Sequence, residues 1–556
     1  MSSQLIFQTR CLSSLSKVFA DEAPLEAPYT HATALRGEQF AFQVAYTSNK
    51  LLKNIAVDVV STLGLPFTIR TVGLVPSEMP CYADHDAQVL RTGPGLYPDP
   101  LYPLDEMGVT ALPGQWRSLW INVELNARVP AGSYALKVML TSDEGEPLGE
   151  EVLELTVLAA ALPKQKLLHT EWFHTDCIAT YYQVDVFSEE HWRLIGAFIE
   201  TAVKHGINMI LTPIFTPPLD TAIGGERPTV QLIGVEIEDG SIEGDRVYHF
   251  DYRKLERWVA LCQSKGVEYF EISHLFTQWG AKHTPKIMAT YQGEEQRIFG
   301  WDTDASGEAY ANFLGQLLPD LDRVLRKLGI ASCTYFHVSD EPLQEHLETY
   351  KNASDLVKKL LPPDYPIIDA LTEISYYEQG IVQKPIPSND HIGPFLEAGI
   401  PDLWTYYCCA QYKDVSNRFF NMPSARNRVI GLQLYKFGIQ GFLHWGYNFY
   451  YAQYAVKQLD PFKVTDALHA FPSGDSFLVY PGEEGPIESI RLEVFYEALQ
   501  DMRALQLLES FIGKERTVAL IEEGLAEPLT FSVYPHSTAW MLDVRERINE
   551  AIAACS

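Results

Sequence analysis

Two adjacent carboxylates, Asp340 and Glu341, have the residue types and the position best suited to catalysis. They follow the apolar run Thr334–Val338, which has the pattern of a buried strand, and Pro342 then fits the first turn of a helix. Cleavage of a glycosidic bond needs one carboxyl group that protonates the leaving oxygen and a second that stabilises the positive anomeric centre. The pair therefore predicts acid–base hydrolysis. The alternative is that both carboxylates only favour the N-terminus of the following helix.

Other predicted strands are also followed by polar and aromatic side chains that could contact a sugar. His174 and Asp176 follow the first strand, and their period-two spacing places them on one face. They could hold sugar hydroxyl groups or form a structural polar pair. Further contacts are expected after the sixth and seventh strands, from Trp404, Tyr407, Trp445, Tyr447 and Asn448. An aromatic residue alone more often packs than binds, but convergence of several on one cleft favours a carbohydrate site.

No group of residues has the sequence spacing of a metal site. His174 and Asp176 could supply two ligands, but no third ligand stands at a recognisable distance in the chain. The eight cysteines include no C-x-x-C motif, and Cys408 and Cys409 are too close for an ordinary structural disulfide. We therefore expect free thiols, no metal and no other cofactor.

The elements that must position these residues form contrasting regions. Residues 1–162 contain short β-rich runs separated by turns, which is typical of an antiparallel β-sandwich. In residues 163–511, eight apolar runs alternate with amphipathic helical stretches, which predicts a (β/α)8 barrel of the TIM type. Residues 512–556 are expected to form a C-terminal helical extension packed on the barrel. The predicted fold class is therefore multidomain, with a β domain followed by an α/β domain.

The predicted barrel strands have short apolar cores. They are Leu167–Phe173, Asn208–Leu211, Val267–Ile272, Thr334–Val338, Ile367–Ala370, Leu403–Tyr407, Phe442–Trp445 and Phe477–Tyr480. Because active sites of such barrels lie at the carboxyl ends of the strands, we expect the polar residues after these runs to converge. In the sandwich, the Pro-rich segment Gly93–Pro103 is expected to be an ordered loop.

Charge and composition limit the partners of the protein. The formal net charge of −29 is spread over the chain, which disfavours nucleic acid and anionic membranes. No apolar run approaches the roughly 20 residues that a membrane helix needs. The first residues lack the pattern of a signal peptide, so we expect a cytoplasmic protein. The oligomeric state is not predicted.

Several separated segments resemble glycoside hydrolase family 123. They are Trp172–Ala179, His337–Pro342, Gly438–Asn448, Gly474–Gly482, Ser489–Glu493 and Glu497–Asp501. Their order agrees with the family, and the N-terminal sandwich fits its layout. The resemblance implies a β-N-acetylgalactosaminidase in which the 2-acetamido carbonyl of the substrate attacks the anomeric carbon. By position, Glu341 would be the general acid and then the base, and Asp340 would orient and polarise the acetamido N–H.

The identity of the sugar stays open at this point. The expected substrate is a small glycan or glycoconjugate with a terminal β-linked N-acetylgalactosamine, cleaved by an exo-acting enzyme. One alternative acts on N-acetylglucosamine or another 2-acetamido sugar, and a second is an inactive glycan-binding barrel. The presence of both Asp340 and Glu341 argues against the inactive barrel. A tyrosine hydroxyl is expected to hold the acetamido oxygen, and Tyr377, Tyr406 and Tyr407 are the candidates.

Overall fold

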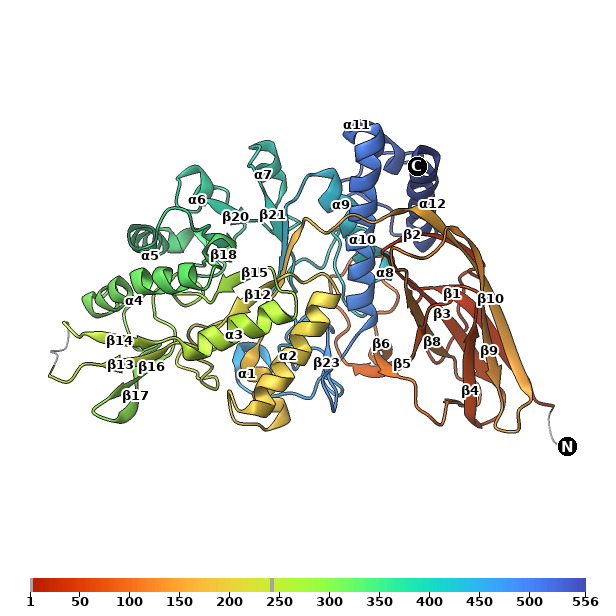
Figure 1. Cartoon of the computed structure of the whole chain (residues 1–556), viewed down its shortest axis with the longest axis horizontal. Helices are drawn as coiled ribbons and strands as arrows, with labels where there is room; N and C mark the ends of the chain where they lie inside the picture. The colour runs from red at the N-terminus through yellow and green to blue at the C-terminus, as the bar shows by residue number, and fades with distance from the viewer. Residues whose placement is uncertain (1–3, 241–244) are drawn as a thin grey trace.

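The computed structural model describes residues 4–240 and 245–556. The N-terminal region contains ten strands, which are β1 (Phe7–Ser13), β2 (His31–Arg36), β3 (Gln39–Ser48), β4 (Leu52–Val60), β5 (Phe67–Ser77), β6 (Gly95–Pro103), β7 (Val109–Ala111), β8 (Arg117–Glu124), β9 (Gly132–Thr141) and β10 (Pro147–Ala161). They form two five-stranded sheets, in the orders β1-β3-β8-β5-β6 and β2-β10-β9-β4-β7 (Figure 1).

Alternating apolar residues of the two sheets form the core of this sandwich. In β9, Leu136, Val138 and Leu140 are buried while the residues between them are partly exposed. This period of two places one face of the strand in the interior. The two sheets agree with the predicted sandwich, but they are not purely antiparallel, because β10 pairs with β2 in parallel.

The Pro-rich segment corrects one expectation, since it is a strand rather than a loop. β6 lies at the edge of its sheet and pairs only with β5 there. Proline is tolerated at such an edge because the missing N–H faces away from the ladder. The outer side of β6 meets the segment before the long C-terminal helix, where the Leu101 N–H donates to the Glu488 carbonyl at 2.9 Å.

Parallel strands dominate the second region. They are β11 (Leu168–Glu171), β12 (Met209–Thr212), β15 (Tyr269–Ile272), β18 (Thr334–Tyr335), β19 (Ile368–Ala370), β20 (Lys384–Ile386), β21 (Trp404–Tyr406) and β22 (Gly441–His444). Six form one sheet in the order β18-β15-β12-β11-β22-β21, and β19 pairs with β20 in a second sheet. Isolated parallel bridges join Phe336 to Ile367 and Ser388 to Tyr406. The predicted α/β organisation is present, as two parallel sheets rather than one continuously paired closed barrel.

The eighth predicted strand lies outside these sheets. Phe477 forms only an isolated antiparallel bridge with Asn448, and β23 (Tyr480–Pro481) pairs with β24 (Pro486–Ile487) in a small hairpin. The eighth parallel strand is β20, which the sequence did not predict and which lies beside β21. It has three residues and contains a proline, so no alternating pattern marks it in the sequence.

The α-helices of the described chain all follow the sandwich in sequence. They are α1 (Thr175–Tyr182), α2 (Glu189–Lys204), α3 (Arg253–Ser264), α4 (Glu308–Lys327), α5 (Leu347–Leu360), α6 (Ser375–Glu378), α7 (Gly393–Glu397), α8 (Ser424–Arg428), α9 (Ile430–Lys436), α10 (Ile490–Ile512), α11 (Lys514–Ile521) and α12 (Thr538–Cys555). Ser188 and Ser489 cap α2 and α10 by accepting a backbone N–H of the first turn. Within the described chain, no helix has both the length and the apolar character needed to cross a bilayer.

A separate, mainly antiparallel sheet of four strands extends from the α/β region on the side away from the sandwich (Figure 1). Its strands are β13 (Gly234–Ile237), β14 (Tyr248–Asp251), β16 (Ile287–Tyr291) and β17 (Glu294–Phe299), in the order β14-β13-β16-β17. These strands interrupt the connections after β12 and β15. They account for the unusual length of both loops.

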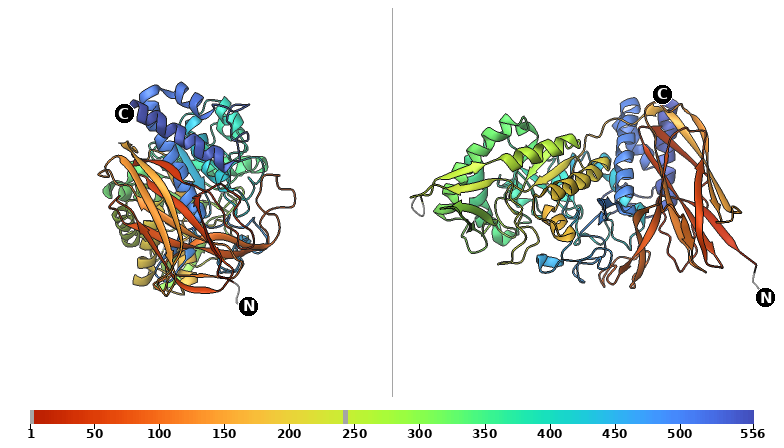
Figure 2. Two further views of the ribbon diagram at one scale, coloured as in Figure 1. Left: turned by 90° about the vertical axis from the view of Figure 1, so that its right-hand side faces the viewer. Right: turned by 60° about the horizontal axis from the view of Figure 1, so that its bottom comes forward.

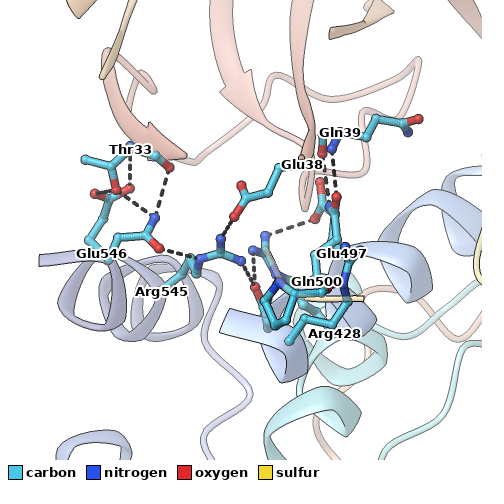
Figure 3. Close-up of polar contacts among 12 residues, drawn as sticks. Thr33, Glu38, Gln39, Arg428, Glu497, Gln500, Arg545 and Glu546 are labelled. Atoms are coloured by element: carbon cyan, nitrogen blue, oxygen red, sulfur yellow. Dashed lines mark hydrogen bonds and ion pairs between the residues drawn. The ribbon is translucent and has the colours of Figure 1, made fainter. Parts of the chain in front are cut away.

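Figures 1 and 2 show that the C-terminal helices α10, α11 and α12 lie between the sandwich and the α/β region. Figure 3 shows the polar contacts that join them to the sandwich. The Arg545 side chain of α12 donates to Glu38, and the Thr33 hydroxyl donates to Glu546 at 2.6 Å. α12 therefore contacts the sandwich as well as α8 and α10. The boundaries at residues 162 and 511 stay predictions.

Candidate active site

A cavity opens at the carboxyl ends of the parallel strands. Asp340, Glu341 and Trp445 line it, as the sequence predicts for residues that directly follow strands. The other lining residues come from the ends of the strands and from the loops that follow them, and are Trp172, Leu219, Asp220, Gln278, Trp279, Ala370, Tyr406, Cys408, Cys409, Leu443, Gln453, Tyr454 and Phe471. The cavity therefore combines carboxylates with aromatic walls.

Asp340 and Glu341 do not lie in the first turn of a helix. A 3-10 turn begins only at Gln344, its N-terminal cap is Leu343, and α5 starts at Leu347. Helix stabilisation therefore does not explain why Asp340 and Glu341 face the cavity.

The backbone around the pair is fixed on both sides. The Ser339 hydroxyl donates to the Thr277 carbonyl at 2.7 Å, and the Trp279 N–H donates to the Asp340 carbonyl at 3.2 Å. The Tyr406 hydroxyl donates to Glu341 Oε1 at 2.8 Å. These contacts fix the backbone at Asp340 and the side chain of Glu341 at the cavity wall.

Four residues of the lining have a left-handed backbone. The φ angles are 39° at Asp220, 58° at Trp279, 42° at Glu341 and 59° at Tyr454. This conformation is costly for residues other than glycine, and it persists where the surrounding structure imposes it. Such residues cluster at ligand sites, and here all four surround one cavity.

The environment favours retention of a proton on the pair. Burial raises the pKa of Asp340 well above its usual range, and the charge of Glu341 adds to this rise. Burial also raises the pKa of Glu341, although the hydrogen bond from Tyr406 partly opposes it. Two neighbouring carboxylates in such a site resist a double negative charge, which favours protonation of one of them.

A buried cation supports the strand that carries the pair. The His337 Nε2 donates to Glu271 at 2.5 Å, and its Nδ1 donates to Asp369 at 3.2 Å. Burial alone would lower the pKa of His337, but these two carboxylates raise it to about 10. Glu271 also accepts the Trp172 indole N–H at 2.8 Å. The His337 charge lowers the pKa of Asp340 and so opposes part of the effect of burial.

Two groups of side chains in the described residues are close enough to hold a metal ion. One is His274, His337 and Asp369, and the other is His205 with Glu488 and Glu493. In the first group both ring nitrogens of His337 already donate to carboxylates. That arrangement suits an imidazolium, whereas a metal needs a neutral imidazole nitrogen.

His174, Asp176 and Asn448, which were predicted to contact the sugar, form a polar network that lies outside the cavity lining. The Asn448 side chain accepts the His174 N–H at 2.8 Å and donates to the His174 carbonyl at 3.1 Å. Asp176 forms a buried ion pair with Arg227 at 2.6 Å. The structure thus favours the structural interpretation of these polar residues. The His174 ring donates to the Trp445 carbonyl at 2.9 Å, which helps to hold a residue that does line the cavity.

Three predicted aromatic contacts also lie outside the lining. Trp404 packs deeper among the strands, with its ring centroid 5.8 Å from that of Tyr335. Tyr407 points to the opposite side of the strand from Tyr406, because successive side chains alternate. Tyr447 is fully buried, and its hydroxyl donates to the Phe198 carbonyl of α2 at 2.9 Å. Of the three candidate tyrosines, Tyr406 lines the cavity, and Tyr377 and Tyr407 do not.

Two polar lining residues were missed by the sequence analysis. Asp220 and Gln278 stand in the long loops after β12 and β15, and the Asp220 N–H donates to the Gln278 side chain at 2.7 Å. The Tyr454 N–H donates to Asp220 Oδ2 at 3.1 Å. Burial raises the pKa of Asp220 to about 6. Loop length was the only sequence signal, because no strand or helix period runs through these segments.

A buried carboxylate pair in an aromatic cavity, at the carboxyl ends of parallel strands, suits the chemistry of a glycosidase. The family model described as "Glycoside hydrolase 123, catalytic domain" matches residues 172–508 of the chain. The chain therefore belongs to glycoside hydrolase family 123. No curated protein matched the chain.

A solved structure of the same family has a similar fold. A family 123 glycoside hydrolase from Clostridium perfringens, described for glycolipid glycan hydrolysis, is similar with a TM-score of 0.74 at 17% identity. The match covers 99% of this chain and 98% of that one. A Parabacteroides merdae β-glucuronidase has a TM-score of 0.31 and 10% identity, over 90% of this chain and 52% of that one.

Proposed function

We propose that the protein is an exo-acting β-N-acetylgalactosaminidase that hydrolyses terminal β-linked N-acetylgalactosamine by substrate-assisted catalysis. The observation that carries this proposal is the adjacency of Asp340 and Glu341 in one cavity. A conventional retaining enzyme places its two carboxyl groups about 5–5.5 Å apart, flanking the scissile bond. Neighbouring residues suit a different division of work, in which one serves the glycosidic oxygen and the other serves the C2 substituent.

In the proposed first step, the acetamido carbonyl oxygen attacks the anomeric carbon while Glu341 donates its proton to the leaving oxygen. The aglycone departs, and the sugar keeps a five-membered oxazoline-type ring. In the second step, ionised Glu341 takes a proton from water as the water oxygen attacks the anomeric carbon. The ring opens, and the sugar is released with its original anomeric configuration.

Asp340 is proposed to accept the acetamido N–H during both steps. This hydrogen bond would stabilise ionised Asp340, and the nearby His337 cation acts in the same direction. The proton held by the pair would then reside on Glu341, where the acid step needs it. Tyr406 orients the Glu341 carboxyl group through its 2.8 Å hydrogen bond.

The remaining lining supports a single terminal sugar. Trp279 and Trp445 offer aromatic surfaces, and the Trp445 indole N–H donates to Asp475 at 2.9 Å, which fixes the orientation of its ring. Asp220 and Gln278 offer polar groups for sugar hydroxyls. Preference for the galacto configuration is proposed from family membership, and the glycolipid glycan hydrolysis described for the Clostridium perfringens protein supports a glycoconjugate substrate.

We also propose that the two parallel sheets act as one (β/α)8-type barrel around this site. The bridges from Phe336 to Ile367 and from Ser388 to Tyr406 support this proposal, because they lie where the edges of the two sheets meet. An interrupted ring of this kind would still direct all strand ends to one cavity.

Hydrolysis of three chromogenic glycosides tests the function. We expect the β-N-acetylgalactosaminide to be cleaved fastest and the β-N-acetylglucosaminide more slowly. The wild type should cleave the plain β-galactoside no faster than the Glu341→Gln variant cleaves it. Faster cleavage of the glucosaminide would change the sugar and keep the mechanism. Equal cleavage of the plain galactoside would refute the acetamido mechanism.

A further inference from the structure

Two neighbouring thiols line the catalytic cavity and take no part in the proposed reaction. Cys408 and Cys409 are both partly exposed, and both are free cysteines. They follow β21 directly, so that Cys408 stands two residues after Tyr406, whose hydroxyl contacts Glu341. A group bound to these thiols would therefore lie beside the catalytic carboxylates.

The two cysteines are adjacent in the chain and line the same cavity. The neighbouring Cys409 thiol is the main cause that raises the pKa of Cys408, ahead of burial, and the charge of Glu341 contributes to the same rise. The Cys408 thiol also contacts Gln411 Oε1 at 3.3 Å, which restricts its direction. The two residues therefore offer a vicinal dithiol at the cavity wall.

The surroundings exclude the more familiar ligands of a thiol pair. A structural zinc ion takes about four ligands and requires deprotonated thiols, which the raised pKa of Cys408 opposes. In the described chain, the clusters able to supply three or more metal ligands contain neither cysteine. Neighbouring cysteines are also too close for the usual geometry of a disulfide. The fitting ligand is a soft centre that needs only two sulfurs and reacts with protonated thiols.

We propose that Cys408 and Cys409 form a chelating site for trivalent arsenicals, and that an arsenical bound there blocks the catalytic cavity. With phenylarsine oxide, two As–S bonds form and the bond between arsenic and oxygen breaks. Both thiol protons leave with that oxygen as one water molecule. Arsenic stays trivalent throughout, so the step needs no oxidant and no reductant.

The test uses the full-length protein, phenylarsine oxide, intact-protein mass spectrometry and the chromogenic assay. We expect one adduct per chain, loss of most activity, recovery with 2,3-dimercaptopropanol, and no recovery with the same concentration of a monothiol. Cys408→Ser and Cys409→Ser each leave one thiol in the cavity and should form no stable adduct. Cys333→Ser is the matched control, because Cys333 is partly exposed but lies outside the cavity lining. It should react like the wild type.

Failure of the arsenical site and failure of the glycosidase proposal give different results. An adduct that persists in both serine variants, or no adduct on the wild type, overturns the dithiol site even if the enzyme is fully active. An adduct that depends on both cysteines but leaves hydrolysis unchanged overturns the blocking of the cavity. If no substrate is cleaved, the mass measurement still decides whether the two thiols chelate arsenic.

Discussion

Replacement of Tyr406 by phenylalanine should move the alkaline limb of the pH–rate profile upward. The Tyr406 hydroxyl donates to Glu341 at 2.8 Å, and this bond lowers the pKa of Glu341 against the effect of burial. A hydrogen bond to a charged group contributes about 1.5–3 kcal/mol, and about 1.4 kcal/mol corresponds to one pKa unit. Loss of the hydroxyl should therefore raise the pKa of Glu341 further and move the alkaline limb in the same direction. Ionised Glu341 forms as the acid step proceeds, so turnover at the optimum should fall about 10- to 100-fold.

The assay is kcat/KM for the chromogenic N-acetylgalactosaminide as a function of pH. Tyr407→Phe is the matched control, because Tyr407 is the next residue and is also buried, but its side chain does not line the cavity. We expect the control to keep the wild-type profile. If Tyr406→Phe and Tyr407→Phe have the same profile and the same rate, Tyr406 does not govern the protonation of Glu341.

Three further predictions concern the carboxylates of the cavity and of the interface between the two regions. In kcat/KM measured over aryl glycosides of graded leaving-group acidity, Glu341→Gln should impair poor leaving groups most, and Asp340→Asn should impair good and poor ones alike. Asp220→Asn should lower kcat/KM about 10-fold and remove the acid limb near pH 6, because burial raises the pKa of Asp220 to about 6 and protonation below that pH removes an acceptor. Glu497→Gln should reduce the fall in Tm that occurs as the pH rises from about 4.5 to about 7. Burial raises the pKa of Glu497 from 4.5 to about 7 despite Arg428, so the folded protein loses stability as pH rises through that interval. Parallel thermal scans of the variant and the wild type, with equal slopes, would contradict this last prediction.

The sequence correctly places Asp340, Glu341 and Trp445 at the cavity, because each stands at the end of an apolar run. It predicts the sugar contacts less well, since the direction of a side chain depends on where the strand ends and how the next turn runs. Tyr406 and Tyr407 are adjacent, and alternation sends one into the cavity and the other away from it. The partner of Asp176 is Arg227, which comes from a loop without a period, so the ion pair was not visible in the chain.

The fold was predictable at the level of regions and less so at the level of single strands. The sandwich and the alternation of strands with helices follow from hydrophobic periods that extend over many residues. β20 has only three residues, and its pairing with β19 depends on tertiary contacts rather than on its own sequence. Phe477–Tyr480 has the pattern of a buried strand, but Phe477 and Tyr480 pack against each other, with ring centroids 5.0 Å apart, beside the parallel sheets.

The most direct test of the central claim is the response of kcat/KM to fluorine on the N-acetyl group of the substrate. Fluorine withdraws electrons from the carbonyl oxygen and weakens it as a nucleophile, while the leaving group stays the same. For aryl β-galactosaminides that carry acetyl, fluoroacetyl, difluoroacetyl and trifluoroacetyl groups, substrate-assisted catalysis predicts a steep and continuous fall in kcat/KM. A value of kcat/KM that stays constant across the series would contradict it.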